Sequence, residues 1–440
     1  MTSKLRSTAL VGALALAALL VATAAPLVAQ APITGLYYQE VEKEGRVYVF
    51  NTPEQLKLWS ESGDVGKAIT LIGRAEGGRT LIGENETAID LYLFKHNLPA
   101  YDRPTPKPKA EPKYPSTKIQ GRFYGDFTSK ENKRDDGVKS SDSGIGVDVK
   151  RFYLTVTHQI DETWSAQFQS DIGDVGARRY DVFVKKAYIQ GKFSDALTFR
   201  LGAADTPWIP YVEGKYGMRY FEQTITDSLG FGTSSDWGLH LLGKAGMFNY
   251  QVSAVNGKSY SRPERSESVD IEARLAIEPV KGLDIAVGGY SGKLGNDVKT
   301  NSPVQHTAER LNAFVGYSTD VWGVGVEYFD ASNWKNVTTV AEDSANGYTV
   351  FANFRPAKSW NIFARYDNAN PSDDLAPNKE ITYYTAGIEK QFNKVFTANF
   401  AYKHAETEGG AVSTGNGSVG GGTNINGDYD EVGFWFVYNF

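Results

Sequence analysis

The chain has 440 residues, no cysteine and a formal net charge of −6. The absence of cysteine excludes a disulfide framework and a cysteine-based metal site. The acidic balance argues against a nucleic-acid partner, whose binding needs a concentrated basic surface. Aromatic residues and glycine are abundant although the overall composition is polar. Strands that alternate lipid-facing and water-facing residues average to such a composition.

The N-terminus has the pattern of a secretory signal peptide, which we assign to residues 1–30. Lys4 and Arg6 precede an apolar run, and small residues follow it. The rest of the chain contains no apolar run near the 18 residues that a membrane-spanning helix needs. A protein that crosses a membrane without such helices has to be a closed β-barrel.

Residues 33–98 are predicted to form a small α/β module on the periplasmic side. Thr52 is the expected N-cap of a first helix, with Gln55 completing a capping box, and Asn85 is the expected N-cap of a second. The expected elements are, in order, a hairpin with its turn at 44–45, a helix over 53–61, a strand over 68–72 and a helix over 86–97.

The module is followed by a linker, residues 99–115, that is rich in proline and lysine. Such a composition is typical of a semi-rigid, extended spacer. An alternative is that the lysines of this linker bind the anionic cell wall.

From residue 116 to residue 440 the hydrophobic pattern has a period of two. On the first strand Ile119 and Phe127 share one face, whereas Arg122 and Asp126 share the other, as expected where one side meets lipid and the other water. The pattern predicts an all-β, sixteen-stranded antiparallel transmembrane β-barrel, with strands near the length that a tilted spanning strand requires. The strands are expected near 117–127, 147–157, 164–172, 183–191, 196–203, 236–244, 248–256, 268–277, 282–291, 308–318, 320–331, 345–355, 358–367, 380–390, 395–404 and 429–440.

The connections between these strands alternate between short and long, which is the pattern of short periplasmic turns and long external loops. The last strand carries Val432, Phe434 and Tyr438 on one face. Such an apolar strand is an aggregation hazard at a free edge, so it is expected to pair with the first strand and close the barrel. Tryptophans near strand ends are expected to form girdles at the two membrane interfaces; they are Trp164, Trp237, Trp322 and Trp360.

Residues 203–235 form the longest irregular insert between predicted strands. Loops of this length inside a compact domain are usually functional, and the many aromatic residues favour a loop that docks on a wall over one exposed to solvent. We therefore expect it to fold into the bore as an inward-folded third external loop. The expected pore constriction consists of Lys215, Arg219, Glu213, Glu222 and Tyr216.

Basic and acidic residues share the water-facing positions of the strands, which predicts an amphoteric lumen. Charges on the wall affect permeation chiefly where a pore is narrow. The alternative is that these residues are solvated wall residues that contribute little to selectivity. The cations expected to line the pore are Arg122, Arg151, Lys186, Arg200, Arg274 and Arg365.

The five histidines are scattered over different segments, with no spacing suited to a metal site or a catalytic triad. We therefore expect neither an enzyme nor a cofactor.

Two segments, LTFRLGAADTPWIPYVEGKYGMRYF at 197–221 and SSDWGLHLLGKAGMFNYQVSAVNGKSY at 234–260, together with the terminal Phe440, resemble the phosphate-selective porins O and P. The resemblance covers the barrel but not the N-terminal module. It implies a trimeric, sixteen-stranded channel in the outer membrane whose third external loop forms the constriction. The barrel departs from the dense cationic lining of phosphate-selective members, since residues 116–440 hold 33 Lys and Arg against 40 Asp and Glu.

The expected function is therefore passive diffusion of small hydrophilic solutes and ions through an outer-membrane porin, with at most a modest preference for phosphate-like anions. The expected partners are outer-membrane lipid, the solutes and two further copies of the chain in a homotrimer. The alternative is a structural anchor in which the module binds peptidoglycan. A constriction in the bore discriminates between the two, because a pure anchor needs none.

Overall fold

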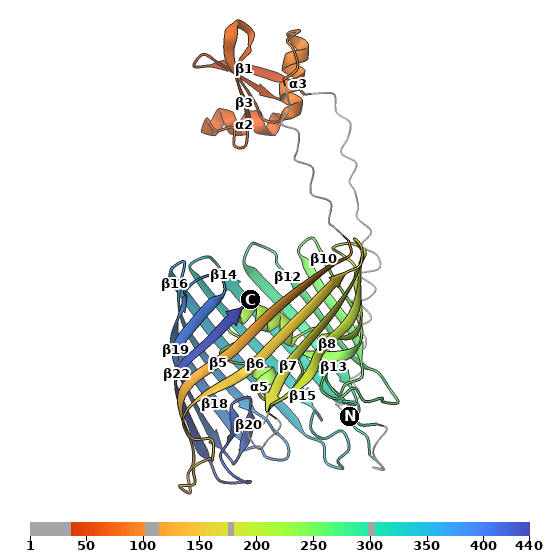
Figure 1. Ribbon diagram of the computed structural model, residues 1–440, viewed down its shortest axis with the longest axis vertical. Coiled ribbons are helices and arrows are strands. Elements are labelled where there is room, and N and C mark those ends of the chain that lie inside the picture. Colours follow the sequence, from red (N-terminus) through yellow and green to blue (C-terminus); the bar gives the residue numbers. More distant parts are fainter. Residues whose placement is uncertain (1–36, 102–113, 175–179, 298–303) are drawn as a thin grey trace. The chain divides into compact units, whose positions relative to one another are not determined.

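The computed structural model describes residues 37–101, 114–174, 180–297 and 304–440, which divide into an N-terminal and a C-terminal unit (Figure 1). The predicted signal peptide and most of the predicted linker lie outside the described residues. Within the described ranges, no helix is both long enough and apolar enough to cross a membrane.

The N-terminal unit is an α/β module with a four-stranded sheet in the order β1-β2-β4-β3. Its elements are β1 Gln39–Lys43, β2 Arg46–Phe50, α2 Pro53–Ser62, β3 Ile69–Ala75, the short 3-10 helix η1 Glu76–Gly78, β4 Arg79–Gly83 and α3 Glu86–Lys95. The sequence pattern did not predict β4, which is short, follows two glycines and ends at Gly83. It is nevertheless central, because Leu81 and Ile82 are buried in the two hydrophobic clusters of the module.

The two helix caps of the module differ in outcome. The predicted cap at Asn85 is confirmed, since its side chain accepts a hydrogen bond from the backbone N–H of Ala88 at 3.0 Å. The capping box at Thr52 is wrong. The Thr52 hydroxyl donates instead to the Glu84 carboxylate at 3.0 Å, and Gln55 donates to the carbonyl of Val65 at 2.9 Å. A hydrogen bond to a charged carboxylate is stronger than a neutral cap, which explains why Thr52 turns away.

The C-terminal unit is a closed barrel of sixteen antiparallel strands, as predicted (Figure 1). Its last strand pairs with its first, and the backbone N–H of Phe440 donates to the carbonyl of Gly121 at 3.0 Å. The strands are β5 Ser116–Arg134, β6 Gly144–Gln159, β7 Trp164–Asp174, β8 Tyr180–Lys192, β9 Thr198–Asp205, β10 Ser235–Ala245, β11 Phe248–Val255, β12 Asp270–Ile277, β13 Leu283–Gly292, β14 Ala308–Ser318, β15 Trp322–Ser332, β16 Ser344–Ala357, β17 Trp360–Asn370, β18 Glu380–Gln391, β19 Phe396–Glu408 and β22 Gly427–Asn439.

Inward and outward residues alternate along the strands, as the period-two pattern predicts. On β22 the side chains of Val432 and Phe434 are exposed on the outer face, whereas Glu431 and Trp435 are buried inside the barrel. Three of the predicted girdle tryptophans follow tight turns and are exposed, and the fourth, Trp237, lies near the start of β10 at the other end of the barrel. Each barrel strand pairs with a neighbouring strand on both sides, which closes the barrel.

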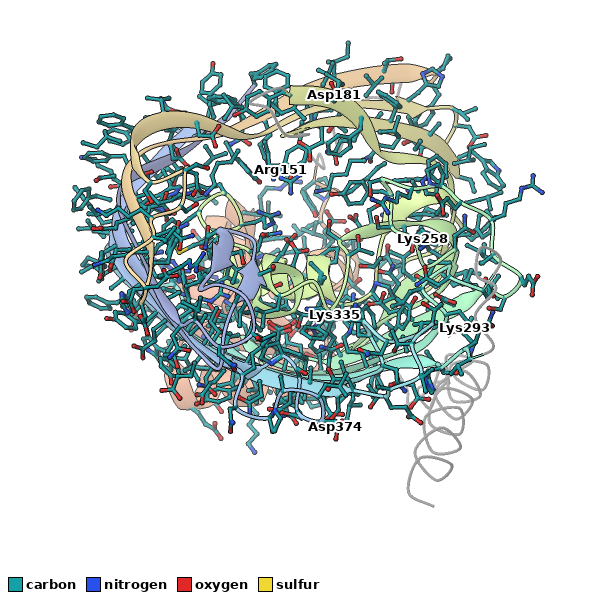
Figure 2. All side chains as sticks on the ribbon, turned by 90° about the horizontal axis from the view of Figure 1, so that it is seen from below. Arg151, Asp181, Lys258, Lys293, Lys335 and Asp374 are labelled. Atoms are coloured by element: carbon teal, nitrogen blue, oxygen red, sulfur yellow. The ribbon has the colours of Figure 1, made fainter. Side chains whose placement is uncertain are left out.

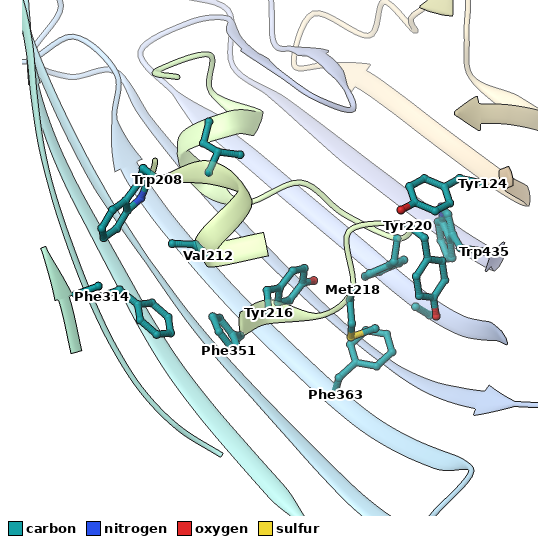
Figure 3. Close-up of a cluster of buried hydrophobic side chains, with 14 of the residues drawn as sticks. Tyr124, Trp208, Val212, Tyr216, Met218, Tyr220, Phe314, Phe351, Phe363 and Trp435 are labelled. Carbon is teal, nitrogen blue, oxygen red and sulfur yellow. The ribbon is translucent and has the colours of Figure 1, made fainter. Parts of the chain in front are cut away.

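The third long loop, residues 206–234, folds against the inside of the barrel wall. It contains two short helices, α4 Ile209–Tyr216 and α5 Ile225–Ser228, where the sequence pattern predicted irregular structure. Figure 3 shows α4 lying across the inner face of the strands, with Val212 and Tyr216 directed toward the side of Phe314 and Phe351. Aromatic packing of this kind buries a large apolar area and fixes the loop.

The last long loop, residues 409–426, also turns inward. It carries a hairpin of β20 Val412–Thr414 and β21 Gly417–Val419, whose two end valines are buried against α5. At the hairpin tip the backbone N–H of Gly415 donates to the hydroxyl of Ser228 at 3.1 Å. Two loops therefore narrow the bore together.

Candidate pore constriction

Two cavities inside the barrel meet at the third loop. The larger, of about 760 Å³, reaches the tight-turn end of the barrel at Trp360. The smaller, of about 410 Å³, reaches the tip of the last loop at Asn416. Both cavities are lined by Tyr124, Arg219 and Tyr220. These three side chains therefore mark the neck of the passage.

Arg219 is held at this neck by acidic residues of its own loop. Its Nε atom lies 2.5 Å from Oε1 of Glu213, and its Nη2 atom lies 3.6 Å from Oδ2 of Asp227. Helix α4 ends at Tyr216, and its cap residue Gly217 has a φ of 77°, a left-handed conformation that glycine adopts without strain. The turn places the guanidinium in the neck, and the two carboxylates fix its orientation.

The other residues of the expected constriction lie at different places. Lys215 points away from the neck, since its Nζ atom is 2.5 Å from Oδ1 of Asp284 on β13, and it lines neither cavity. Tyr216 is buried beneath the loop. Glu222 lines the smaller cavity and lies 3.0 Å from Nζ of Lys403. The structure thus brings Arg219 and Glu213 together at the neck and separates Lys215 from them.

The wall opposite the loop carries two pairs of adjacent cations. The pairing of β5 with β6 shifts by one residue, so Lys150 enters the lumen beside Arg151. The pairing of β7 with β8 shifts in the same way, so Lys185 enters beside Lys186. Such β-bulges redirect a side chain and are common near functional sites.

Strict alternation places Lys150 and Lys185 on the lipid face, so neither lysine was among the residues predicted to line the pore. A lysine there costs roughly 2–4 kcal/mol at the bilayer midplane. Two consecutive cations within one spanning strand were thus a readable signal of a bulge.

Two carboxylates on this wall are each shared by two cations. Asp171 is fully buried, whereas Asp205 is half-buried and lines the larger cavity. One carboxylate neutralises only one of its two partners, so each group keeps a net positive charge. The contacts are Arg151 Nη1 at 2.9 Å and Lys185 Nζ at 3.9 Å from Asp171 Oδ2, Lys186 Nζ at 2.5 Å from Asp205 Oδ1, and Arg200 Nη1 at 3.8 Å from Asp205 Oδ2. Figure 2 shows Arg151 on the open side of the bore.

On the wall against which the third loop packs, four buried cations hold the loop by its backbone. Each cation donates a hydrogen bond to a loop carbonyl. Without it, the carbonyl would be buried inside the barrel with no hydrogen-bond donor to replace water. The pairs are Arg274 to Pro207, Lys403 to Phe221, Arg365 to Gln223 and Arg310 to Phe231. Arg274 and Arg365, which the alternation assigned to the pore lining, therefore anchor the loop.

The remaining expected lining cations lie on the open side. Arg122 lines the larger cavity and donates to the side chain of Asn439 at 2.8 Å. Arg200 lines a separate side cavity near the tight turns.

The lining of the two cavities that meet at the neck is richer in cations than the barrel as a whole. Basic residues outnumber acidic ones in the lining, whereas acidic residues outnumber basic ones over residues 116–440. The basic lining residues are Arg122, Lys150, Arg151, Lys185, Lys186, Arg219, Arg355 and Lys358; the acidic ones are Asp148, Asp205, Glu213, Glu222 and Glu389.

A closed sixteen-stranded barrel whose third loop folds inward is the fold of the outer-membrane porins. The anion-selective porin from Comamonas acidovorans matches with a TM-score of 0.57 and 13% identity, over 74% of this chain and 99% of that chain. The outer membrane channel DcaP of Acinetobacter baumannii matches with a TM-score of 0.51 and 11% identity, over 74% and 97%. OmpF of Salmonella typhi matches with a TM-score of 0.51 and 14% identity, over 74% and 98%. No protein-family model and no curated protein matches the sequence.

Proposed function

We propose that the protein is an outer-membrane porin through which small hydrophilic solutes and ions diffuse passively, with a modest preference for anions. The observation that carries this proposal is the meeting of two cavities at Arg219, inside a closed barrel and under a loop that is anchored from the wall. The porin fold of similar structures supports the same assignment.

The preference for anions rests on where the charges lie. In a narrow, partly desolvated space Coulomb interactions exceed those in bulk water several-fold. Charges on the broad wall are screened over about 8–10 Å at physiological salt. The lining of the neck therefore outweighs the acidic total of the barrel. Carboxylates of the loop such as Glu213 oppose the wall cations, so the preference for anions is modest. We therefore propose that the chain is a member of the phosphate-selective porin O and P family that lacks specificity for phosphate.

We further propose that the barrel lies in the outer membrane as a homotrimer, with the N-terminal module in the periplasm, and that it acts without enzymatic chemistry or a cofactor. The resemblance of residues 197–221 and 234–260 to trimeric porins supports this assembly. Chemical crosslinking of the detergent-solubilised protein tests it, since a trimer gives a ladder that ends at three subunits.

The alternative function is an anchor whose module binds peptidoglycan. Purified protein in a planar bilayer separates the two functions. A porin gives stable conductance steps, and a tenfold KCl gradient gives a zero-current potential with the sign of anion preference. Absence of conductance from correctly folded, heat-modifiable protein would favour the anchor.

A further inference from the structure

We propose that the smaller cavity and the neck form a binding track for organic anions that carry a flat aromatic ring. This inference rests on the proposed function, because it concerns which solutes use the same passage. It is carried by a row of aromatic side chains that runs beside the wall cations.

The row begins with a phenylalanine that faces water. Phe183 lines the smaller cavity, and it stands directly opposite Asp171, which faces the lumen. Its neighbour Val182 is 73% exposed on the outer face of the barrel. The lumen of such a barrel is ordinarily polar, so a benzyl group there needs a reason. Gly173 makes room for the ring, since a Cβ atom at that position would lie 2.9 Å from Cε1 of Phe183.

The ring of Phe183 is continued by other aromatic groups toward the neck. Tyr260 stacks on it with a centroid distance of 5.8 Å and an interplanar angle of 19°. The ammonium group of Lys185 lies 5.3 Å from the ring centre of Tyr260 and 4.9 Å from that of Tyr153. Tyr153 contacts Tyr124 edge-on at 5.5 Å. The row therefore reaches a side chain that lines both cavities.

Packing of the third loop explains part of this row but not its outer end. Tyr124 and Tyr153 belong to the hydrophobic cluster that fixes the loop. Phe183 and Tyr260 belong to neither of the clusters in the barrel, and Tyr260 comes from the loop between β11 and β12. Phe183 is only partly buried and lines the smaller cavity, so part of its ring is accessible to a solute.

Cations accompany the rings over the same length. Lys150 and Arg151 line the smaller cavity with Phe183, and Arg219 follows at the neck. A compact anion such as acetate can use only these charges. An aromatic carboxylate can place its charge on the cations and its ring against Phe183, and rings prefer offset-stacked or edge-to-face contacts of this kind.

The test compares three carboxylates with the full-length protein in a planar bilayer. Benzoate, cyclohexanecarboxylate and acetate carry the same charge. Benzoate and cyclohexanecarboxylate also have similar volumes, so only the flat aromatic ring distinguishes these two. Each is added to KCl on the side of the long loops, and the concentration that halves the single-channel current is measured. We expect the concentration of benzoate that halves the current to be roughly threefold or more below that of cyclohexanecarboxylate, because benzoate adds one aromatic contact. We expect acetate to have no effect.

Two variants assign the effect to the ring. Phe183→Leu keeps an apolar side chain without aromatic character and should abolish the advantage of benzoate. Phe168→Leu, on the outer face of the same wall, should leave it unchanged. Equal action of benzoate and cyclohexanecarboxylate, or an undiminished advantage in Phe183→Leu, overturns the inference. The zero-current potential in KCl without carboxylates tests the proposed anion preference independently, so the two failures are distinguishable.

Discussion

Arg219 and Glu213, six residues apart on the third loop, form an ion pair that lines the larger cavity, with Nε and Oε1 2.5 Å apart. The cation of this pair also lines the smaller cavity, whereas the carboxylate does not. The charge that both halves of the passage share is therefore positive.

Charge reversal at this pair should change ion selectivity. Arg219→Glu places a third carboxylate beside Glu213 and Asp227, so the zero-current potential in a KCl gradient should move toward cation preference. Glu213→Gln should move it the opposite way. Lys215→Glu is the matched control, because Lys215 is on the same loop but pairs with Asp284 away from the neck. Equal shifts from Arg219→Glu and Lys215→Glu would contradict this placement of the neck.

The shared carboxylates of the opposite wall give a second prediction. Arg151→Gln and Lys186→Gln each remove one of two cations around a single carboxylate, leaving that group neutral. Each should lower the anion-to-cation permeability ratio about twofold, because the lost charge acts in a narrow space. Lys139→Gln is the control, since Lys139 is exposed on the first long loop and pairs with Glu131. A change in Lys139→Gln as large as in the wall variants would show that distant charge, not the lining, sets selectivity.

The anchors of the third loop predict an effect on channel noise. Arg274 is the best position to test, because it donates to the carbonyl of Pro207 at 2.7 Å and to the side chain of Asn249, and it forms no ion pair with any described residue. Arg274→Met should remove about 1.5–3 kcal/mol of hydrogen bonding to a charged group. We expect larger open-channel current fluctuations and a higher mean conductance. Lys192→Met, at an exposed turn, serves as the control, and equally quiet currents in both variants would argue against the anchor.

The N-terminal module should be most stable in mildly acidic solution. Hydrogen bonds to Glu40, at 2.9 Å, and to Glu76 raise the pKa of His96. Partial burial opposes ionisation of Glu40, but hydrogen bonds from Tyr38, Lys95 and His96 outweigh it and lower its pKa. The His96 contribution is complete below its ordinary pKa of 6.5 and is lost as pH rises through the raised value. The Glu40 contribution is complete above its ordinary value of 4.5 and is lost as pH falls through the lowered one.

Denaturant unfolding of residues 35–101, followed by the fluorescence of Trp59, measures this dependence. The free energy of unfolding should be greatest between about pH 4.5 and 6.5. His96→Gln should remove the decline above that range while leaving the decline at lower pH. A decline above pH 6.5 that persists in His96→Gln would contradict the assignment.

The barrel strands could be predicted from sequence because each faces two solvents of opposite polarity. A one-residue slip would put a residue such as Phe434 into the lumen, so every strand has to keep the alternation of apolar and polar residues. The alternating loop lengths add independent information, and the aromatic content of residues 203–235 indicated a loop that docks on the wall.

The details of the site could not be predicted because they depend on contacts between distant segments. The bulge that turns Lys185 inward breaks the alternation that the prediction relies on. Whether an inward arginine such as Arg274 meets water or a loop carbonyl depends on where the third loop docks. The hairpin of the last loop has no hydrophobic period, since it is rich in glycine and is ordered by contacts with α5.

The constriction at Arg219 can be probed by thiol accessibility, because the chain has no cysteine of its own. Arg219→Cys and Lys215→Cys each carry a single thiol, and a sulfonatoethyl methanethiosulfonate reagent is added while single-channel current is recorded. Modification of Arg219→Cys should lower the conductance in a clear step and reduce anion preference. Lys215→Cys should show little change. An equal response of the two variants, or unchanged current in Arg219→Cys after mass spectrometry confirms modification, would contradict a constriction at this residue.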